Sequence, residues 1–377
     1  MINRAQILEI QSRIDFKKAI ILLGARRLGK TSLLRQLGEQ LQQPYLYFSA
    51  DEPAVREIWK PENTSALLAS FGTHKVIMID EAQLMENAGL TLKIMIDKAL
   101  GYQFIVTGSS ALELANNTYE SLTGRKWTFE LYPISTAELL AQTNLLEVNR
   151  QLENRLIYGS YPEVVVKQAE ARTILANIVQ SYLYKDILAT GVIRKPALLE
   201  KLVKALALQI GSEVSLNELS RLTGADVKTV DAYIRLLEQT YLIFTLPSFS
   251  RNLRKEIGRG RKVFFYDNGI RNALLNSFAP LAVRTDVGQL WENFLMSERL
   301  KFTSYTKRYC NRYFWRTVTQ QEIDYIEEAD SMLSAFKFKW NPQAKSRFAK
   351  TFLDAYKPVE TQVIHKNNYW EWLTNKP

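Results

Sequence analysis

Short apolar runs alternate with amphipathic stretches over the first third of the chain. Each apolar run has the length of a strand, and a stretch that can hold a helix separates it from the next; the runs are Ala19–Leu23, Tyr45–Ser49, Val76–Asp80, Phe104–Thr107 and Trp127–Leu131. Residues 1–18 precede them as a short amphipathic helix. This alternation predicts a mostly parallel sheet with helices on both faces, hence an α/β domain.

The pattern changes after about residue 135. Helical periodicity dominates from 136 to 240, and Ser215 and Asp226 stand at positions that suit N-caps. Further strands are predicted at Leu242–Leu246, Lys262–Tyr266, Arg312–Thr317, Glu322–Ile326 and Met332–Trp340, with a helix near Gly288–Leu300. We therefore predict three domains: an α/β domain over 1–135, a helical region with a winged-helix-like segment over 136–275, and a small α/β domain over 276–377.

A phosphate-binding motif follows the first predicted strand directly. It matches the Walker A pattern G-x-x-x-x-G-K-[ST] and opens a helical run; its residues are Gly24, Ala25, Arg26, Arg27, Leu28, Gly29, Lys30, Thr31 and the following Ser32. The glycines let backbone N–H groups point at phosphate oxygens, and the lysine neutralises the β and γ phosphates. Because the threonine hydroxyl is a ligand for Mg²⁺, the sequence predicts a P-loop NTPase domain that binds ATP and Mg²⁺.

Two carboxylates end the third predicted strand, as in a Walker B element. Asp80 is expected to hold the Mg²⁺ shell, and Glu81 to orient and polarise the attacking water. Ser109, after the next strand, either contacts the γ-phosphate or the catalytic water or only ends a turn. Arg125 is either an ordinary surface arginine or a ligand of the γ-phosphate, in its own subunit or a neighbour's.

These motifs together carry a family resemblance. The segments Gly24–Thr31, Asp80–Gln83, Thr107–Ser110, Leu122–Arg125 and Gly159–Glu163 resemble those of uncharacterised AAA+-like ATPases of bacteria and archaea, which couple the ATPase to a helical region and a C-terminal domain of unknown function. The last segment has a serine where that family has a second glycine. The resemblance covers almost the whole chain and implies ATPase activity in a prokaryotic cytoplasm.

The winged-helix-like segment suggests a DNA-binding module. Two helices, Ser215–Thr223 and Val227–Glu238, precede a two-stranded wing whose loop is strongly basic, with Arg251, Arg254, Lys255, Arg259, Arg261 and Lys262. Such a loop can contact phosphates without reading bases. The alternatives are a protein-interaction module and a solvated basic loop.

The family's C-terminal domain resembles the PD-(D/E)xK nuclease fold. Glu292 matches the helix acid and Asp324 the strand Asp, but Lys337 stands where a metal-binding carboxylate is expected. A cation there repels Mg²⁺, so we expect a degenerate nuclease-like domain in which Asp324 and Lys339 form a structural pair. Glu322 is the neighbouring acid that would restore the site.

Composition narrows the choice of function. A single cysteine and two histidines leave no internal disulfide and no Cys/His zinc site, and the net charge of +10 suits an anionic partner or a solvated basic face. No run is long enough to span a membrane and no signal peptide is recognised, so a cytoplasmic protein is expected. The leading hypothesis is an ATP-driven switch or motor acting on nucleic acid or a protein partner. The alternatives are a slow-turnover regulatory scaffold and an ATP-regulated nuclease, and oligomer formation is left open.

Overall fold

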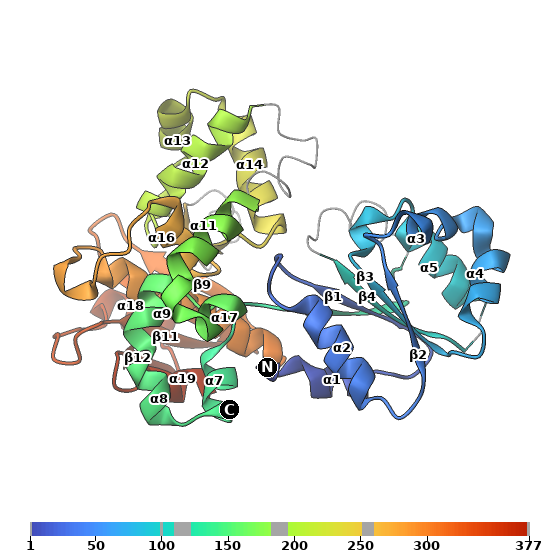
Figure 1. The fold of residues 1–377 in the computed structure, drawn as a ribbon. Helices are drawn as coiled ribbons and strands as arrows, with labels where there is room; N and C mark the ends of the chain where they lie inside the picture. Colours follow the sequence, from blue (N-terminus) through green and yellow to red (C-terminus); the bar gives the residue numbers. More distant parts are fainter. Residues whose placement is uncertain (1, 99–100, 109–121, 182–194, 251–259, 375–377) are drawn as a thin grey trace. The chain divides into compact units, whose positions relative to one another are not determined.

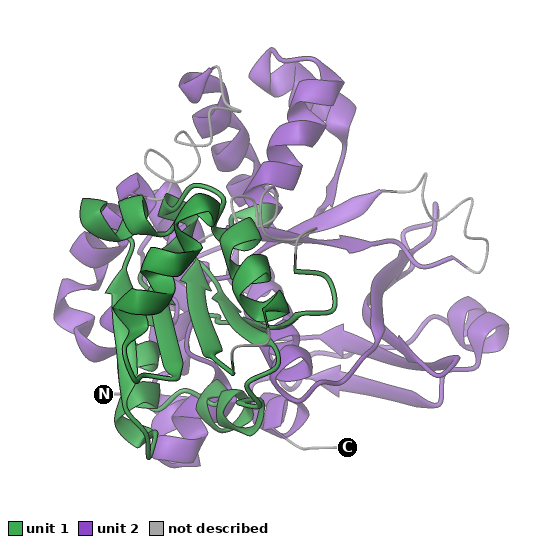
Figure 2. Ribbon diagram, turned by 90° about the vertical axis from the view of Figure 1, so that its right-hand side faces the viewer, with its two compact units in different colours: residues 1–132, 239–241 green, residues 133–238, 242–377 purple. Residues whose placement is uncertain are grey.

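The computed structural model describes residues 2–98, 101–108, 122–181, 195–250 and 260–374. The chain forms two compact units (Figures 1 and 2). Unit 1 contains residues 1–132 and 239–241, and unit 2 contains residues 133–238 and 242–377. Apart from residues 239–241, the second and third predicted domains lie in unit 2, and their boundary at residue 275 stays a prediction.

Unit 1 is built on a five-stranded sheet in the order β2–β3–β4–β1–β5, with every neighbouring pair parallel. The strands are β1 (Ala19–Leu23), β2 (Tyr45–Ser49), β3 (Val76–Asp80), β4 (Gln103–Gly108) and β5 (Lys126–Glu130). Each coincides within one residue with a predicted strand. Since β1, β3 and β4 are buried along their whole length, both faces of the sheet are covered, as expected for a parallel sheet. The predicted α/β fold of the P-loop NTPase type is confirmed.

One helix precedes these strands and others connect them. They are α1 (Gln6–Ser12), α2 (Lys30–Gln40), α3 (Pro53–Ile58), α4 (Thr64–Phe71) and α5 (Ala88–Asp97), with 3-10 turns η1 (Pro61–Asn63) and η2 (Ala82–Leu84). Aromatic rings form a core, in which Trp59, just after α3, lies 5.9 Å from Phe48 on β2 and 6.3 Å from Phe104 on β4, both edge to face. This packing helps to fix β2 and β4, which are the neighbours of β3 in the sheet.

Unit 2 begins with helices. They are α7 (Thr136–Gln142), α8 (Leu145–Arg150), α9 (Leu152–Tyr158), α10 (Pro162–Val166), α11 (Ala171–Ser181), α12 (Pro196–Leu208), α13 (Leu216–Thr223) and α14 (Val227–Gln239), with the turn η4 (Gln168–Glu170). The two predicted N-caps are present. Ser215 Oγ accepts from Glu218 N–H at 3.3 Å, and Asp226 Oδ1 accepts from Thr229 N–H at 2.9 Å.

Two small sheets complete unit 2. The first has the order β6–β8–β7 and is antiparallel, with β6 (Glu213–Val214), β7 (Ile243–Pro247) and β8 (Arg261–Phe265). The second has the order β12–β11–β10–β9, with β9 (Asn311–Arg316), β10 (Glu322–Ala329), β11 (Met332–Phe338) and β12 (Glu360–Ile364), and only the β11–β12 pair is parallel. The accompanying helices are α16 (Asn268–Leu274), η6 (Leu281–Val283), α17 (Val287–Tyr305), α18 (Lys350–Tyr356) and α19 (Tyr369–Thr374). Strands β6 and β12 were not predicted from the sequence.

The segment Gly159–Glu163, which carries part of the family resemblance, has a packing role. Gly159 has φ 73°, and a Cβ there would lie 1.9 Å from Asp267 Oδ1, so only glycine fits. Ser160 N–H donates to Asp267 Oδ2 at 2.6 Å, and Ser160 Oγ accepts from Arg155 Nε at 2.9 Å. This segment therefore joins α9 to the N-terminus of α16 within unit 2.

Candidate functional site

The predicted phosphate-binding loop connects β1 to α2. Two of its residues adopt left-handed backbone, Arg27 at φ 60° and Gly29 at φ 87°. Gly24 at φ 151° is also sterically required, since a Cβ would lie 2.3 Å from the carbonyl oxygen of Leu131. The loop is thus held in a tight curl against the segment that follows β5.

The ammonium of Lys30 lies inside this curl. It donates to the carbonyl oxygens of Gly24 at 2.8 Å and Ala25 at 2.9 Å, and the residue is buried. Lys30 is also the first residue of α2, whose free N–H groups and dipole favour an anion at the same place. The loop therefore presents the charge and the donors that a polyphosphate requires.

The carboxylate of Asp80 meets the P-loop at the carboxyl edge of the sheet. Its Oδ2 accepts from Thr31 Oγ1 at 2.6 Å and from Tyr47 Oη at 2.8 Å, and its Oδ1 accepts from Thr107 Oγ1. Burial and the hydrogen bond to Asp80 raise the pKa of Tyr47. Two neighbouring strands, β2 and β4, and helix α2 thus supply donors to one buried carboxylate on β3.

Glu81, the next residue, has strained backbone. Its φ of 55° and ψ of 39° lie in the left-handed region, which costs a non-glycine residue on the order of 1 kcal/mol or more. Its N–H donates to Thr107 Oγ1 at 3.1 Å, and its Oε2 accepts from the amide of Gln83. These contacts hold the carboxylate just beyond Asp80, where the sequence predicts the catalytic base.

These residues suit ATP with Mg²⁺. The hydroxyl of Thr31 and the carboxylate of Asp80 are hard oxygen ligands 2.6 Å apart, and the ammonium of Lys30 lies in the loop that begins the same helix. Thr31 and Asp80 would hold the ion, and the loop N–H groups and Lys30 would hold the phosphates.

Sequence reasoning missed three side chains at this site. Thr107 and Tyr47 both bond Asp80, and a hydroxyl residue near the carboxyl end of a parallel strand was the available signal. Arg4 is buried and donates to the carbonyl oxygens of Leu28 at 2.8 Å and Tyr132. No local pattern marks Arg4, because these partners lie 24 and 128 residues away.

The structure corrects the prediction that Arg125 can reach the γ-phosphate in its own chain. Ala19 N–H donates to Arg125 O at 2.9 Å, so Arg125 lies where β1 begins, and the P-loop follows the other end of that strand. Five strand residues separate the two edges by about 17 Å. The guanidinium instead donates to Asp97 and to Thr123 O. Ser109 lies outside the described residues.

A second predicted site, in unit 2, contains a cation that the sequence did not place there. Lys262 on β8 is buried, and its Nζ lies 2.9 Å from Glu292 Oε1 and 2.6 Å from Glu322 Oε1. Burial disfavours the ammonium, yet Glu292, Glu322 and Asp324 together raise the pKa of Lys262. Burial raises the pKa of Glu292 to about 7, against the opposing effect of Lys262. The positive charge of Lys262 therefore offsets the negative charge of the acidic residues beside it.

This arrangement corrects two predictions. Lys337, expected to block the metal site, donates instead to Arg347 O at 3.2 Å, and Asp324 accepts from the N–H of Phe338 at 2.6 Å. Lys262 was expected to contact phosphates, but its ammonium is buried and paired. Lys262 pairs with Glu292 and Glu322, and among the described residues no ion pair joins Asp324 to Lys339.

Of the other basic residues predicted to contact phosphates, only Arg261 lies among the described residues. Arg261 is paired with Asp231, and Arg251, Arg254, Lys255 and Arg259 lie outside the described residues. Within the described part of the chain, no group of three or more His, Cys, Asp or Glu residues is arranged to hold a metal ion. No helix among the described residues is both long and apolar enough to cross a membrane.

Three family models and several known proteins match parts of this chain. A family model described as an AAA domain matches residues 16–140, and two models described as domains of unknown function match residues 149–281 and 287–373. An uncharacterised protein of Haemophilus influenzae is 26% identical over 294 residues, which are 72% of this chain and 73% of that protein. One from Methanocaldococcus jannaschii is 24% identical over 271 residues, 66% of this chain and 60% of that protein.

Two solved structures are among those to which parts of this chain are similar. The Walker-type ATPase of Pyrococcus abyssi has a TM-score of 0.49 at 15% identity, covering 73% of this chain and 96% of its own. The RuvB Holliday junction branch migration motor of Thermotoga maritima has a TM-score of 0.36 at 17% identity, covering 74% and 96%. The parallel sheet and the loop after β1 give unit 1 a P-loop NTPase fold, and residues 16–140 match the AAA family model.

Proposed function

We propose that unit 1 binds ATP with Mg²⁺ and hydrolyses it to ADP and phosphate. The observation that carries this proposal is the convergence of Lys30, Thr31, Asp80 and Glu81 at one edge of the parallel sheet, with Thr107 bonded to both acidic residues. Bound Mg²⁺ would neutralise charge on the transferred phosphoryl group. Glu81 accepts the proton of the attacking water, and Lys30 compensates the β and γ phosphates.

Nucleotide binding by a Lys30→Ala variant tests the proposal. Lys30 is the side-chain cation inside the loop, so the variant should lose at least about tenfold in ATP affinity, as expected for one charge-assisted hydrogen bond. The measurement is a titration of the folded variant with a fluorescent ATP analogue and Mg²⁺. Lys17→Ala is the matched control, because Lys17 is exposed and precedes β1 at the other edge of the sheet. Equal affinity in Lys30→Ala and the wild type would refute the site.

We further propose that ATP turnover drives a switch or motor that acts on nucleic acid or a protein partner. Its support is the order α13, α14, β7, β8 in unit 2, which suits a winged helix, and the basic residues between its two strands. Steady-state phosphate release with and without DNA separates this proposal from a slow-turnover regulatory scaffold. Stimulation by DNA supports the switch or motor, and slow release unaffected by DNA supports the scaffold.

The third alternative, an ATP-regulated nuclease, is opposed by Lys262. An ammonium already pairs with Glu292 and Glu322, and it would have to leave before those carboxylates could hold Mg²⁺. We therefore place the ATPase activity in unit 1 and assign no cleavage activity to unit 2.

A further inference from the structure

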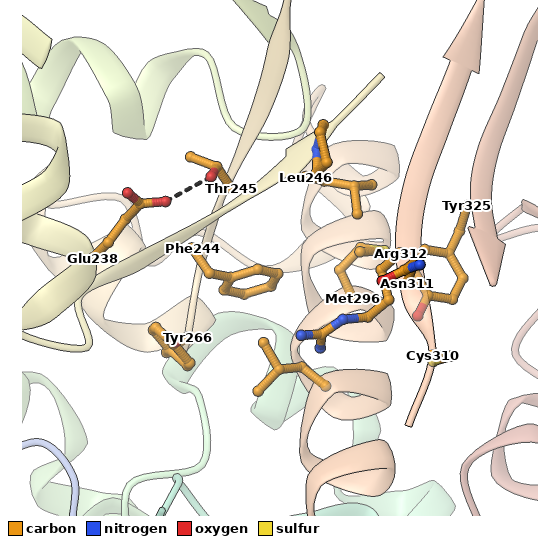
Figure 3. A pocket seen from close by; sticks show the side chains of 12 residues that line it. Glu238, Phe244, Thr245, Leu246, Tyr266, Met296, Cys310, Asn311, Arg312 and Tyr325 are labelled. Carbon is orange, nitrogen blue, oxygen red and sulfur yellow. Dashed lines mark hydrogen bonds between the residues drawn. The ribbon is translucent and has the colours of Figure 1, made fainter. Parts of the chain in front are cut away.

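A cavity of about 350 Å³ in unit 2 belongs to neither of these sites (Figure 3). It is lined mainly by residues of β7, α17 and the start of β9. Its apolar side is formed by Phe244 and Leu246 on β7 and by Met296 and Leu300, which are one turn apart on α17. The volume falls within the range of small-molecule sites.

The aromatic wall of this cavity is preformed. The ring of Phe244 stacks on Phe264 with centroids 5.6 Å apart and lies 5.1 Å from the ring of Tyr266. Strands β7 and β8 pair in register and fix the backbone beneath these rings. A ligand would therefore meet an apolar surface that is already ordered, and its binding would cost little reorganisation.

Arg312 supplies a positive charge at this cavity. Figure 3 shows its guanidinium extending from β9 toward the side on which Phe244 lies. Its cross-strand neighbour Glu327 is already occupied by Arg299 at 2.6 and 2.9 Å and by Arg308 at 3.1 Å. Among the described residues, none gives the Arg312 side chain a hydrogen bond or an ion pair. Its fork is thus available to a carboxylate, sulfonate or phosphate.

A negatively charged residue, Glu238, lies at another part of the cavity lining. Glu238 Oε1 accepts from Thr245 Oγ1 at 2.6 Å, as the dashed line in Figure 3 marks. A carboxylate there repels an anionic group and can accept a hydrogen bond from a ligand donor. The two charged residues therefore orient a ligand, with its anionic group at Arg312 and its apolar body along Phe244, Met296 and Leu300.

We propose that this cavity binds a small amphiphilic anion, a molecule with one acidic group on an apolar, aromatic-sized body. The site lies in unit 2 and is separate from the nucleotide chemistry of unit 1. It gives the accessory unit a small-molecule input of its own.

A pair of fluorescent probes that differ in one charge tests this assignment. The probes are 1-anilinonaphthalene-8-sulfonate and its uncharged analogue N-phenyl-1-naphthylamine, titrated into the full chain. Arg312→Gln should weaken sulfonate-probe binding about tenfold or more, because it removes a charge-assisted hydrogen bond. The same variant should leave the affinity for the neutral probe unchanged within about twofold. Arg316→Gln, on the same strand outside the cavity lining, is the matched control and should behave as the wild type.

Each possible result of these titrations either supports or overturns the proposed site. A loss confined to Arg312→Gln and to the sulfonate probe, with displacement of that probe by benzoate in the wild type, supports the site. An unchanged sulfonate affinity in Arg312→Gln overturns it, as does an equal loss of both probes or the absence of binding to the wild type. Met296→Trp, which fills the cavity, should weaken both probes, and unchanged binding in that folded variant also overturns the proposal.

Discussion

At Asp80, three hydroxyl groups donate to one buried carboxylate. Thr107 differs from the other two donors because its oxygen also accepts the N–H of Glu81. A single hydroxyl therefore fixes both the metal-site acid and the strained residue that follows it. This makes Thr107 a positioning residue for the proposed base.

We predict that Thr107→Val lowers kcat for ATP hydrolysis about tenfold or more and leaves the KM for ATP within about threefold. Valine keeps the shape and loses both hydrogen bonds, so the left-handed backbone of Glu81 loses its support. Thr107→Ser, which keeps the hydroxyl, should restore most of kcat. Steady-state phosphate release gives both constants, and a normal kcat in the valine variant would remove Thr107 from the mechanism.

Between elements of unit 2, buried ion pairs act as links. Glu298 on α17 accepts from the N–H of Thr136 at the start of α7 and pairs with Arg155 of α9 at 3.1 Å and with Lys301 at 2.6 Å. Burial alone would raise the pKa of Glu298, but Lys301 and Arg155 lower it to about 2. Removing the charge leaves two buried cations without their counter-ion.

Glu298→Gln should destabilise the protein by about 3–5 kcal/mol at neutral pH. The folded pKa of about 2 lies below the unfolded value of about 4.3, so the carboxylate stabilises the fold above pH 4.3 and loses this effect as the pH falls toward 2. Urea unfolding should thus show a constant gap between variant and wild type from pH 7 to 5 that narrows below about pH 4.3. Glu147→Gln is the control, because the pKa of Glu147 is also lowered to about 2 while its ion pair with Arg150 is exposed. This variant should shift the urea midpoint far less. A gap that is the same at every pH would contradict the account.

The strands and the buried contacts differ in how far the sequence could predict them. Apolar runs gave β1, β3 and β4, because a strand covered on both faces must be apolar throughout. Strands β2 and β5 were also predicted, although most of their residues are only partly buried. Strand β12 was missed because most of its residues are polar and only its last is buried. The partners of Lys262 were not predictable, since Glu292 lies 30 residues away and no local pattern links them. Sequence thus predicted the residues of the P-loop and Asp80, but not the buried contacts that position them.

Over the whole molecule, the excess positive charge is the feature that most directly implies a partner. The net charge is +10, and Lys262 and Arg261 are already paired with acids, so the basic loop has fewer available cations than its sequence suggests. Arg251, Arg254, Lys255 and Arg259 are the remaining candidates for phosphate contact.

Replacing these four residues by glutamine should weaken DNA binding and make its salt dependence shallower, by up to about 0.9 log unit of slope for each phosphate that the loop no longer neutralises. The measurement is DNA affinity over a salt series. Glutamine at four exposed lysines elsewhere, Lys17, Lys98, Lys345 and Lys350, removes the same charge and serves as the control. An equal change in both variants would point to bulk charge, and an unaltered slope would favour a protein partner.

The central claim, that ATP is hydrolysed at the edge of the unit 1 sheet with Glu81 as the base, is tested most directly by phosphate release from a Glu81→Gln variant at saturating ATP and Mg²⁺. The amide keeps the size of the side chain and cannot accept the proton of the attacking water. We predict that ATP binding is retained and that turnover falls by about 100-fold or more. Turnover at the wild-type rate in this variant, or no phosphate release by the wild type, would contradict the account.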